Sequence, residues 1–206
     1  IMLGRLDALR IDGRELRDQP VSAMVRQIRQ AAILRAVLSP NGLYERMVDF
    51  WTNHLNIYAH KGLAAYRLPT ATEKVVRPHA LGSFQEMVRA SARSPAMLAY
   101  LDNIRNSQYG PNENYARELL ELHTLGVHGG YTQRDVREVA RCLTGWTVER
   151  RFLRSYDGLA FQERHHDDGE KLVLGRRIAP GGGKQDLYQV LDIVLNHPAT
   201  AKHIAG

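Results

Sequence analysis

The chain has 206 residues, of which 28 are Lys or Arg and 22 are Asp or Glu, so its formal net charge at pH 7 is +6. Hydrophobic residues make up 44% and charged residues 24%, which are ordinary values for globular domains and exclude a disordered or collagen-like chain. The single cysteine, Cys142, excludes an internal disulfide and a cysteine-based zinc site, and no run of about 18 apolar residues predicts a membrane span.

Apolar residues recur at helical spacing through the first half of the chain. A turn at Ser39-Pro40-Asn41-Gly42 separates the first two of these stretches. Residues 61–76 are predicted to form a loop or a short helix. The predicted helices of this half span residues 20–38, 43–58, 77–92 and 95–101.

The second half continues this pattern, with one interruption. Thr132 and Asp135 have the spacing of a capping box, and Gly126 is a predicted helix C-cap. Between residues 148 and 178 the period changes, and two short apolar runs around Asp168-Gly169 predict a β-hairpin. The predicted helices span residues 113–125, 132–144 and 186–195, and another begins at Pro198.

The predicted fold class is therefore mainly α, a multi-helix bundle-like domain with one small β-hairpin near residues 150–178. The length fits one domain or at most two small ones, and we predict a single helical domain over residues 1–206. Because the chain stops soon after Pro198 begins a new helix, we expect it to be a fragment of a longer protein.

Ionisable residues on the apolar faces of these helices are the candidate functional residues, because burial without a partner is costly. His54 falls within the apolar arc of its helix, beside Trp51. It is interpreted either as a metal ligand or general base, or as a core histidine bonded to a backbone carbonyl.

Glu118 and His123 point inward from the helix over residues 113–125, whose inner face is predicted to be Tyr115, Leu119 and Leu122. Glu118 is either an acid/base or ligand group, or the partner of an arginine on another helix. The two side chains are about 140° apart around the helix axis, so they are not expected to bind one ion from this helix alone.

The run His165-His166-Asp167-Asp168 contains four side chains of metal-ligand type. Neighbouring side chains in a turn diverge, so either two of them reach one ion or the run is a solvated turn. Cys142 has no histidine at a readable spacing and is interpreted as structural.

Long stretches of the chain resemble the bacterial family known as Domain of Unknown Function 1800. The stretch over residues 112–127 (Asn-Glu-Asn-Tyr-Ala-Arg-Glu-Leu-Leu-Glu-Leu-His-Thr-Leu-Gly-Val) carries the strongest resemblance. Other matching pieces are residues 45–54, Arg77-Pro78-His79, Pro95-Ala96-Met97-Leu98, Leu101-Asp102-Asn103, Tyr131-Thr132-Gln133, Leu143-Thr144-Gly145-Trp146-Thr147, His166-Asp167 and His197-Pro198-Ala199-Thr200-Ala201.

The resemblance implies a setting but no settled chemistry. Members of the family are often exported and often encoded beside a sulfatase-like exported family, which implies a periplasmic or extracellular location and an exported sulfatase-like partner. The residues that stand within the motifs of the family are Trp51, Asn53, His54, Arg77, His79, Asn103, Asn114, Arg117, Glu118, Glu121, His123, Trp146, His166 and Asp167.

Two functions remain open, and the sequence does not decide whether the chain is an enzyme. One is a hydrolase acting on an envelope or extracellular polymer, with His54, Glu118 and His123 as catalytic residues. Its substrate-binding residues would be Trp51, Asn53, Arg77, Asn114 and Arg117, and the candidate ligands of a divalent metal are His54, Glu118, His166 and Asp167. The alternative is a non-catalytic scaffold or partner-binding protein with a buried polar bracing network. No nucleic-acid partner is predicted, because the positive charge is spread along the chain without a recognised motif.

Overall fold

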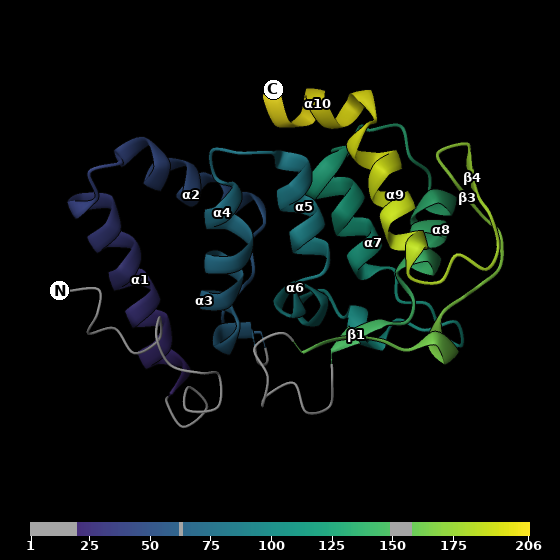
Figure 1. Cartoon of the computed structure of the whole chain (residues 1–206), viewed down its shortest axis with the longest axis horizontal. Helices are drawn as coiled ribbons and strands as arrows, with labels where there is room; N and C mark the ends of the chain where they lie inside the picture. The colour runs from purple at the N-terminus through teal and green to yellow at the C-terminus, as the bar shows by residue number, and fades with distance from the viewer. Residues whose placement is uncertain (1–19, 62–63, 149–157) are drawn as a thin grey trace. The chain divides into compact units, whose positions relative to one another are not determined.

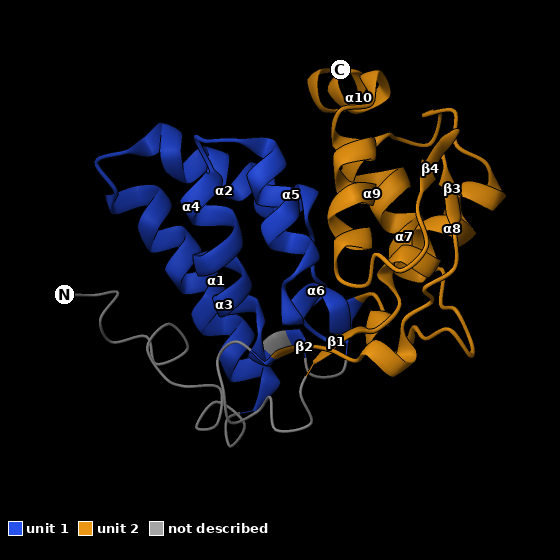
Figure 2. Cartoon of the chain, turned by 45° about the vertical axis from the view of Figure 1, so that its right-hand side comes forward, with its two compact units in different colours: residues 1–100, 149–158 blue, residues 101–148, 159–206 orange. Residues whose placement is uncertain are grey.

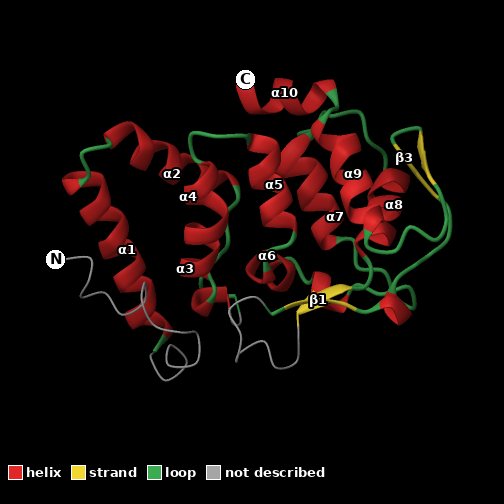
Figure 3. Cartoon of the chain, in the orientation of Figure 1, coloured by secondary structure: helices red, strands yellow, loops and turns green. Residues whose placement is uncertain are grey.

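The computed structural model describes residues 20–61, 64–148 and 158–206 and confirms a mainly helical chain with small antiparallel sheets (Figures 1 and 3). The chain divides into two compact units (Figure 2). Unit 1 comprises residues 1–100 and 149–158, and unit 2 comprises residues 101–148 and 159–206. The single domain over residues 1–206 stays a prediction.

Unit 1 is helical in its described part. Helix α1 packs against α2, and the core includes Met87, Val88 and Leu98. The elements are α1 (Val21–Leu38), α2 (Gly42–His54), the 3-10 turn η4 (Ala64–Tyr66), α3 (Leu68–Ala71), the π-helical η5 (Thr72–Val76), α4 (Arg77–His79), α5 (Phe84–Ala92) and α6 (Pro95–Tyr100).

The predicted start of the helix over residues 77–92 is wrong, because Pro78 lies near the end of a helix, whereas the predicted end agrees with α5, which ends at Ala92. Elements α3, η5 and α4 form one helical run over residues 68–79. Pro78 has no backbone N–H to donate to the carbonyl four residues earlier. The wider π-helical turn of η5 ends at Val76, two residues before this proline. The chain then breaks, and α5 begins after Ser83, whose side chain accepts a hydrogen bond from the Glu86 N–H.

Unit 2 packs α8 and α9 against each other, and α10 against η7. Its elements are the 3-10 turn η6 (Asn103–Arg105), α7 (Asn114–Glu118), the π-helical η7 (Leu119–Thr124), α8 (Gln133–Leu143), β1 (Trp146–Val148), β2 (Leu159–Phe161), the 3-10 turn η8 (Glu163–His165), β3 (Lys171–Val173), β4 (Arg176–Ile178), α9 (Gln185–Leu195) and α10 (Pro198–Ala205). The capping box of Thr132 and Asp135 is present at the start of α8, as predicted.

The strands of unit 2 form two small antiparallel pairs. Strand β1 pairs with β2, and β3 pairs with β4. The predicted pairing around Asp168-Gly169 is wrong, since the β3–β4 turn is Leu174-Gly175. Both turn residues have positive φ, 49° and 74°, as the tightest hairpin turn requires, and glycine adopts such angles without strain. Residues 150–157 of the predicted hairpin range lie outside the described residues.

The helix predicted over residues 113–125 changes type in its middle. The α-helical α7 continues as the π-helical η7, which has more residues per turn. The predicted inward position of Leu122 is therefore wrong, and this side chain is 48% exposed. The angle predicted between Glu118 and His123 does not apply for the same reason.

Within the described ranges, no helix has the length and apolar character needed to cross a membrane.

Candidate functional site

Three of the predicted site residues of unit 1, Trp51, Asn53 and His54, lie at the end of α2. The half-buried His54 is the last residue of α2, and its ring centroid lies 5.7 Å from that of Trp51 and 5.9 Å from that of Phe84. The buried Trp51 donates its indole N–H to the Ala80 carbonyl at 3.1 Å. Asn53 is exposed and donates to the Asp49 carbonyl at 2.9 Å.

The predicted catalytic and substrate-binding residues of unit 2 lie along α7 and η7. Glu118 is half-buried at the end of α7, and His123 is buried in η7. Arg117 forms an ion pair with Glu113 at 3.1 Å. Asn114 donates its side-chain N–H to the Leu101 carbonyl at 3.2 Å. His54 and Glu118 thus belong to different units, and their roles as catalytic residues stay predictions.

The most buried charged groups of the described chain lie elsewhere in unit 2. His166, Lys171 and Asp186 have residue exposures of 2%, 1% and 0%. Lys171 Nζ lies 2.5 Å from Asp186 Oδ2 and also donates to the Asp167 carbonyl. His166 Nε2 lies 3.1 Å from the same Asp186 Oδ2. We call these three residues the buried triad.

Thr144 sets the orientation of the His166 ring. Its carbonyl oxygen lies 2.8 Å from His166 Nδ1, so that nitrogen must carry a proton and donate it. The other ring nitrogen, Nε2, faces the Asp186 carboxylate, and a proton carried by either partner makes a hydrogen bond there. The Thr144 contact therefore holds Nε2 of the ring toward Asp186 Oδ2.

Asp167, next to the triad, pairs with Arg141 of α8. Arg141 donates from Nε to Oδ2 at 2.7 Å and from Nη2 to Oδ1 at 3.0 Å. This bidentate contact lowers the pKa of the Asp167 carboxyl and raises the pKa of the Arg141 guanidinium. Both Asp167 oxygens are thus engaged by one side chain.

Buried asparagines of unit 2 hold its backbone. Asn103 donates to the carbonyls of Leu143 and Trp146 at 3.1 and 2.9 Å. Asn106 donates to the Ala140 carbonyl at 2.8 Å and to the Asn103 side-chain oxygen at 3.1 Å. These motif-region amides tie the end of α8 and the start of β1 together, which is a bracing role.

Two of the four candidate metal ligands, His166 and Asp167, are engaged by these protein contacts. In the part of the chain that the structure describes, no three His, Cys, Asp or Glu side chains form a group that could hold a metal ion. Metal binding by His54, Glu118, His166 or Asp167 stays a prediction.

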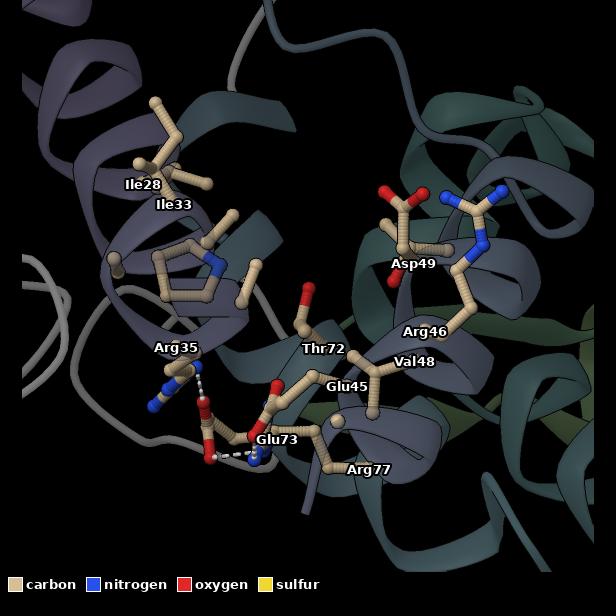
Figure 4. A pocket seen from close by; sticks show the side chains of 16 residues that line it. Ile28, Ile33, Arg35, Glu45, Arg46, Val48, Asp49, Thr72, Glu73 and Arg77 are labelled. Carbon is tan, nitrogen blue, oxygen red and sulfur yellow. Dashed lines mark hydrogen bonds and ion pairs between the residues drawn. The ribbon is translucent and has the colours of Figure 1, made fainter. Parts of the chain in front are cut away.

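A pocket of about 440 Å³ lies in unit 1, among α1, α2, α3 and η5 (Figure 4). Its apolar lining includes Ile28 and Ile33 of α1, Val48 of α2 and Pro69 of α3. This volume is within the range of small-molecule and side-chain binding pockets. His54 and Trp51 are not among the residues that line it.

Ion pairs fix one wall of this pocket. Arg77 donates to both carboxylate oxygens of Glu45 at 2.8 Å, and Arg35 pairs with Glu73 at 2.7 Å (Figure 4). The hydrogen bonds from Arg77 lower the pKa of Glu45. These pairs join α1, α2 and the run over residues 68–79, so they hold the spacing of the helices that form the pocket.

Cys142 is fully buried on α8, close to the triad. Burial raises the pKa of its thiol to about 12. This agrees with the structural interpretation of the residue, because a reactive cysteine requires an accessible thiolate.

The sequence comparisons match this chain to one family. Its model, described as "Protein of unknown function (DUF1800)", matches residues 3–206. The chain belongs to this family. No curated protein and no solved structure matches the chain. The family assignment confirms the resemblance seen in the motifs, and it adds no activity.

Lys171 and Asp186 were not predicted to be interior groups, although their positions in the sequence indicate it. Asp186 stands four residues before Val190 and eight before Val194, on the buried face of α9. Lys171 and Val173 share the inward face of β3, and the exposed Leu172 stands between them.

Proposed function

We propose that this chain is a non-catalytic, partner-binding protein and that its partner contacts unit 1. The contact surface would be the 440 Å³ pocket together with exposed apolar side chains of α1 and α2, and we call it the α1–α2 face. Ile33, Val37 and Leu43 on this face are 63%, 74% and 70% exposed. This continuity of pocket and exposed apolar surface is the observation that carries the proposal.

The shape of this surface favours a protein partner over a small ligand. Small-molecule sites enclose most of the ligand, whereas here the apolar surface extends from Ile33 in the pocket to Val37 and Leu38, further along α1. Contiguous apolar surface on a folded protein is typical of interaction sites. The ion pairs of Glu45 and Glu73 supply a preformed wall, which reduces the entropy lost on binding.

The buried groups of unit 2 support a bracing role over catalysis. The triad side chains contact one another and backbone carbonyls, and each of them is at most 2% exposed. A general acid or base must reach its substrate, either directly or through one water molecule. The triad does not meet this requirement as it stands.

For the partner we propose the exported sulfatase-like protein that the family context implies, and for the location the periplasm or the extracellular space. Fractionation of cells that express the tagged full-length protein tests the location. Recovery of the protein with cytosolic markers would contradict it.

Binding of the two purified proteins tests the function, with calorimetry as the measurement. We expect Val37→Glu to weaken the affinity at least tenfold, because it places a charge within the apolar contact. The matched control is Val127→Glu in unit 2, which introduces the same charge at a side chain that is 62% exposed. Equal affinity for the wild type and Val37→Glu, or equal weakening by both variants, would contradict the proposal.

Hydrolase activity and the binding of a divalent metal remain predictions from the sequence, and a separate experiment tests them. Metal analysis of the full-length protein, purified without chelator, would support them if it finds stoichiometric metal that His54→Ala removes.

A further inference from the structure

The buried triad combines an amine, a carboxylate and a proton donor at bonding distances. Lys171 Nζ and His166 Nε2 both face Asp186 Oδ2, at 2.5 and 3.1 Å. The three side chains come from β3, the start of α9 and the segment after η8, and all are almost fully enclosed. The proposed partner binding uses none of the three, and the predicted hydrolase uses neither Lys171 nor Asp186.

The other carboxylate oxygen of Asp186 is unusual. Oδ1 is buried and has no hydrogen-bond partner within the described structure. Gly182 lies so close that a Cβ atom there would be 2.0 Å from Oδ1. A charged oxygen in such a place costs free energy, whereas the oxygen of a neutral group in the same place costs much less.

The surroundings disfavour the separated charges. Asp186 and Lys171 pack with α8, whose inward side chains include Val139 and Cys142. Desolvation of an ion pair can exceed the attraction between its charges. Reaction of the two groups to a neutral product would remove both charges from this interior.

We propose that Lys171 and Asp186 are joined by an intramolecular isopeptide bond that forms when unit 2 folds. A proton passes from the Lys171 ammonium to the carboxylate, and the free amine Nζ attacks Asp186 Cγ. The Nζ–Cγ bond forms, the Cγ–Oδ2 bond breaks, and Oδ2 leaves as water. An ammonium and a carboxylate thus give one amide and one water molecule, with no oxidant or reductant.

His166 is the positioning and proton-transfer residue of this step. Its Nε2 accepts a proton from Nζ and passes it to the departing Oδ2. Thr144 holds the ring in place through Nδ1. The Asp167 carbonyl accepts from Nζ and orients the amine. Fixed reactants in an enclosed site gain a large effective concentration, which such a condensation needs in water.

Intact mass spectrometry of the denatured full-length protein tests the bond. We expect the protein to be lighter than its sequence mass by one water molecule. Trypsin should fail to cut after Lys171, so the peptides 165–176 and 185–202 should appear as one branched species. The sequence mass together with separate peptides 165–171, 172–176 and 185–202 would overturn the proposal.

Variants assign the loss of water to this site. Asp186→Ala and Lys171→Met should have their full sequence masses, and the control Asp168→Asn should keep the branched peptide. His166→Gln should lower the linked fraction at least tenfold after a fixed refolding time. This readout separates proton transfer from bracing, because it compares only folded molecules recovered by size-exclusion chromatography. A branched peptide in Asp186→Ala, or normal linkage in His166→Gln, would contradict the assigned roles.

Discussion

Asp167 is the clearest case of a single residue whose charge is set by its structural partner. It accepts two hydrogen bonds from Arg141 and one from the Gly169 N–H, at 2.9 Å. These contacts stabilise the carboxylate, and the pKa of Asp167 in the folded protein is therefore below its value in the unfolded chain. The Asp167 charge thus stabilises the folded protein at neutral pH, and protonation removes this contribution.

We expect Asp167→Asn to lower the free energy of unfolding at pH 7 by about 1–3 kcal/mol. The carboxyl of Asp167 contributes fully above its unfolded pKa of about 3.9 and loses the contribution as pH falls through its lower folded pKa. The difference between the wild type and the variant should therefore shrink below about pH 4. Urea unfolding between pH 3 and 7 measures it.

The control for this prediction is Asp168→Asn, which changes an exposed neighbouring carboxyl. We expect it to change the free energy of unfolding by less than about 0.5 kcal/mol. A constant difference between the wild type and Asp167→Asn from pH 7 to pH 3 would contradict the role assigned to Asp167.

At the scale of elements, one carboxylate couples the start of α8 to the β3–β4 hairpin. Asp135 Oδ2 accepts from the Thr132 backbone N–H at 2.8 Å and completes the capping box. Its other oxygen, Oδ1, accepts from the Leu174 N–H in the hairpin turn at 2.7 Å. The cap of a helix is therefore also a support for a neighbouring strand pair.

This double role predicts unequal effects of two substitutions in the same capping box. Thr132→Ala should lower the free energy of unfolding by about 1 kcal/mol. Asp135→Ala should lower it by about 2–3 kcal/mol, because the hairpin turn also loses its acceptor. Circular dichroism during urea unfolding measures both, with the exposed Arg134→Ala as the control. Asp135→Ala no more destabilised than Thr132→Ala would show that the hairpin contact contributes nothing.

The sequence predicted those elements whose signals are local. The helix over residues 20–38 and the capping box at Thr132 depend on apolar spacing and on a short motif, and both are present. The π-helical turns of η5 and η7 were not predicted, because an α-helical period was assumed for every residue. Leu122 was misplaced for that reason. The helix expected to begin at Arg77 was misplaced because Pro78 lies near the end of a helical run.

The candidate site was less predictable than the fold. Periodicity indicates which side of an element is buried, but it does not indicate which buried groups from distant segments meet. His166 was recognised as a candidate, yet its partners Lys171 and Asp186 lie in a short strand and at the start of a helix. Their contact depends on how the hairpin and α9 pack, which no spacing within either segment encodes.

At the scale of the molecule, each unit carries one of the two tryptophans. Trp51 belongs to unit 1 and Trp146 to unit 2, and both are buried in the folded chain. The fluorescence of each tryptophan should therefore change when its own unit unfolds. Chains with more than one folding unit often depart from two-state unfolding.

We expect a substitution in one unit to shift only the transition reported from that unit. Glu45→Gln removes the bidentate contact with Arg77, so it should lower the urea midpoint of Trp51 fluorescence in a Trp146→Phe background. In a Trp51→Phe background the same substitution should leave the midpoint of Trp146 unchanged. Equal shifts of both midpoints would show that the units unfold as one.

The enclosed sulfhydryl of Cys142 should not interfere with site-specific thiol labelling of the folded protein. Because this thiol is fully buried and its pKa is raised to about 12, alkylating dyes should not react with it while the protein is folded. A spectroscopic label can then be attached to a cysteine introduced anywhere on the exterior without first deleting the native one. In mild denaturant, the rate at which the Cys142 thiol reacts would measure how often α8 opens transiently.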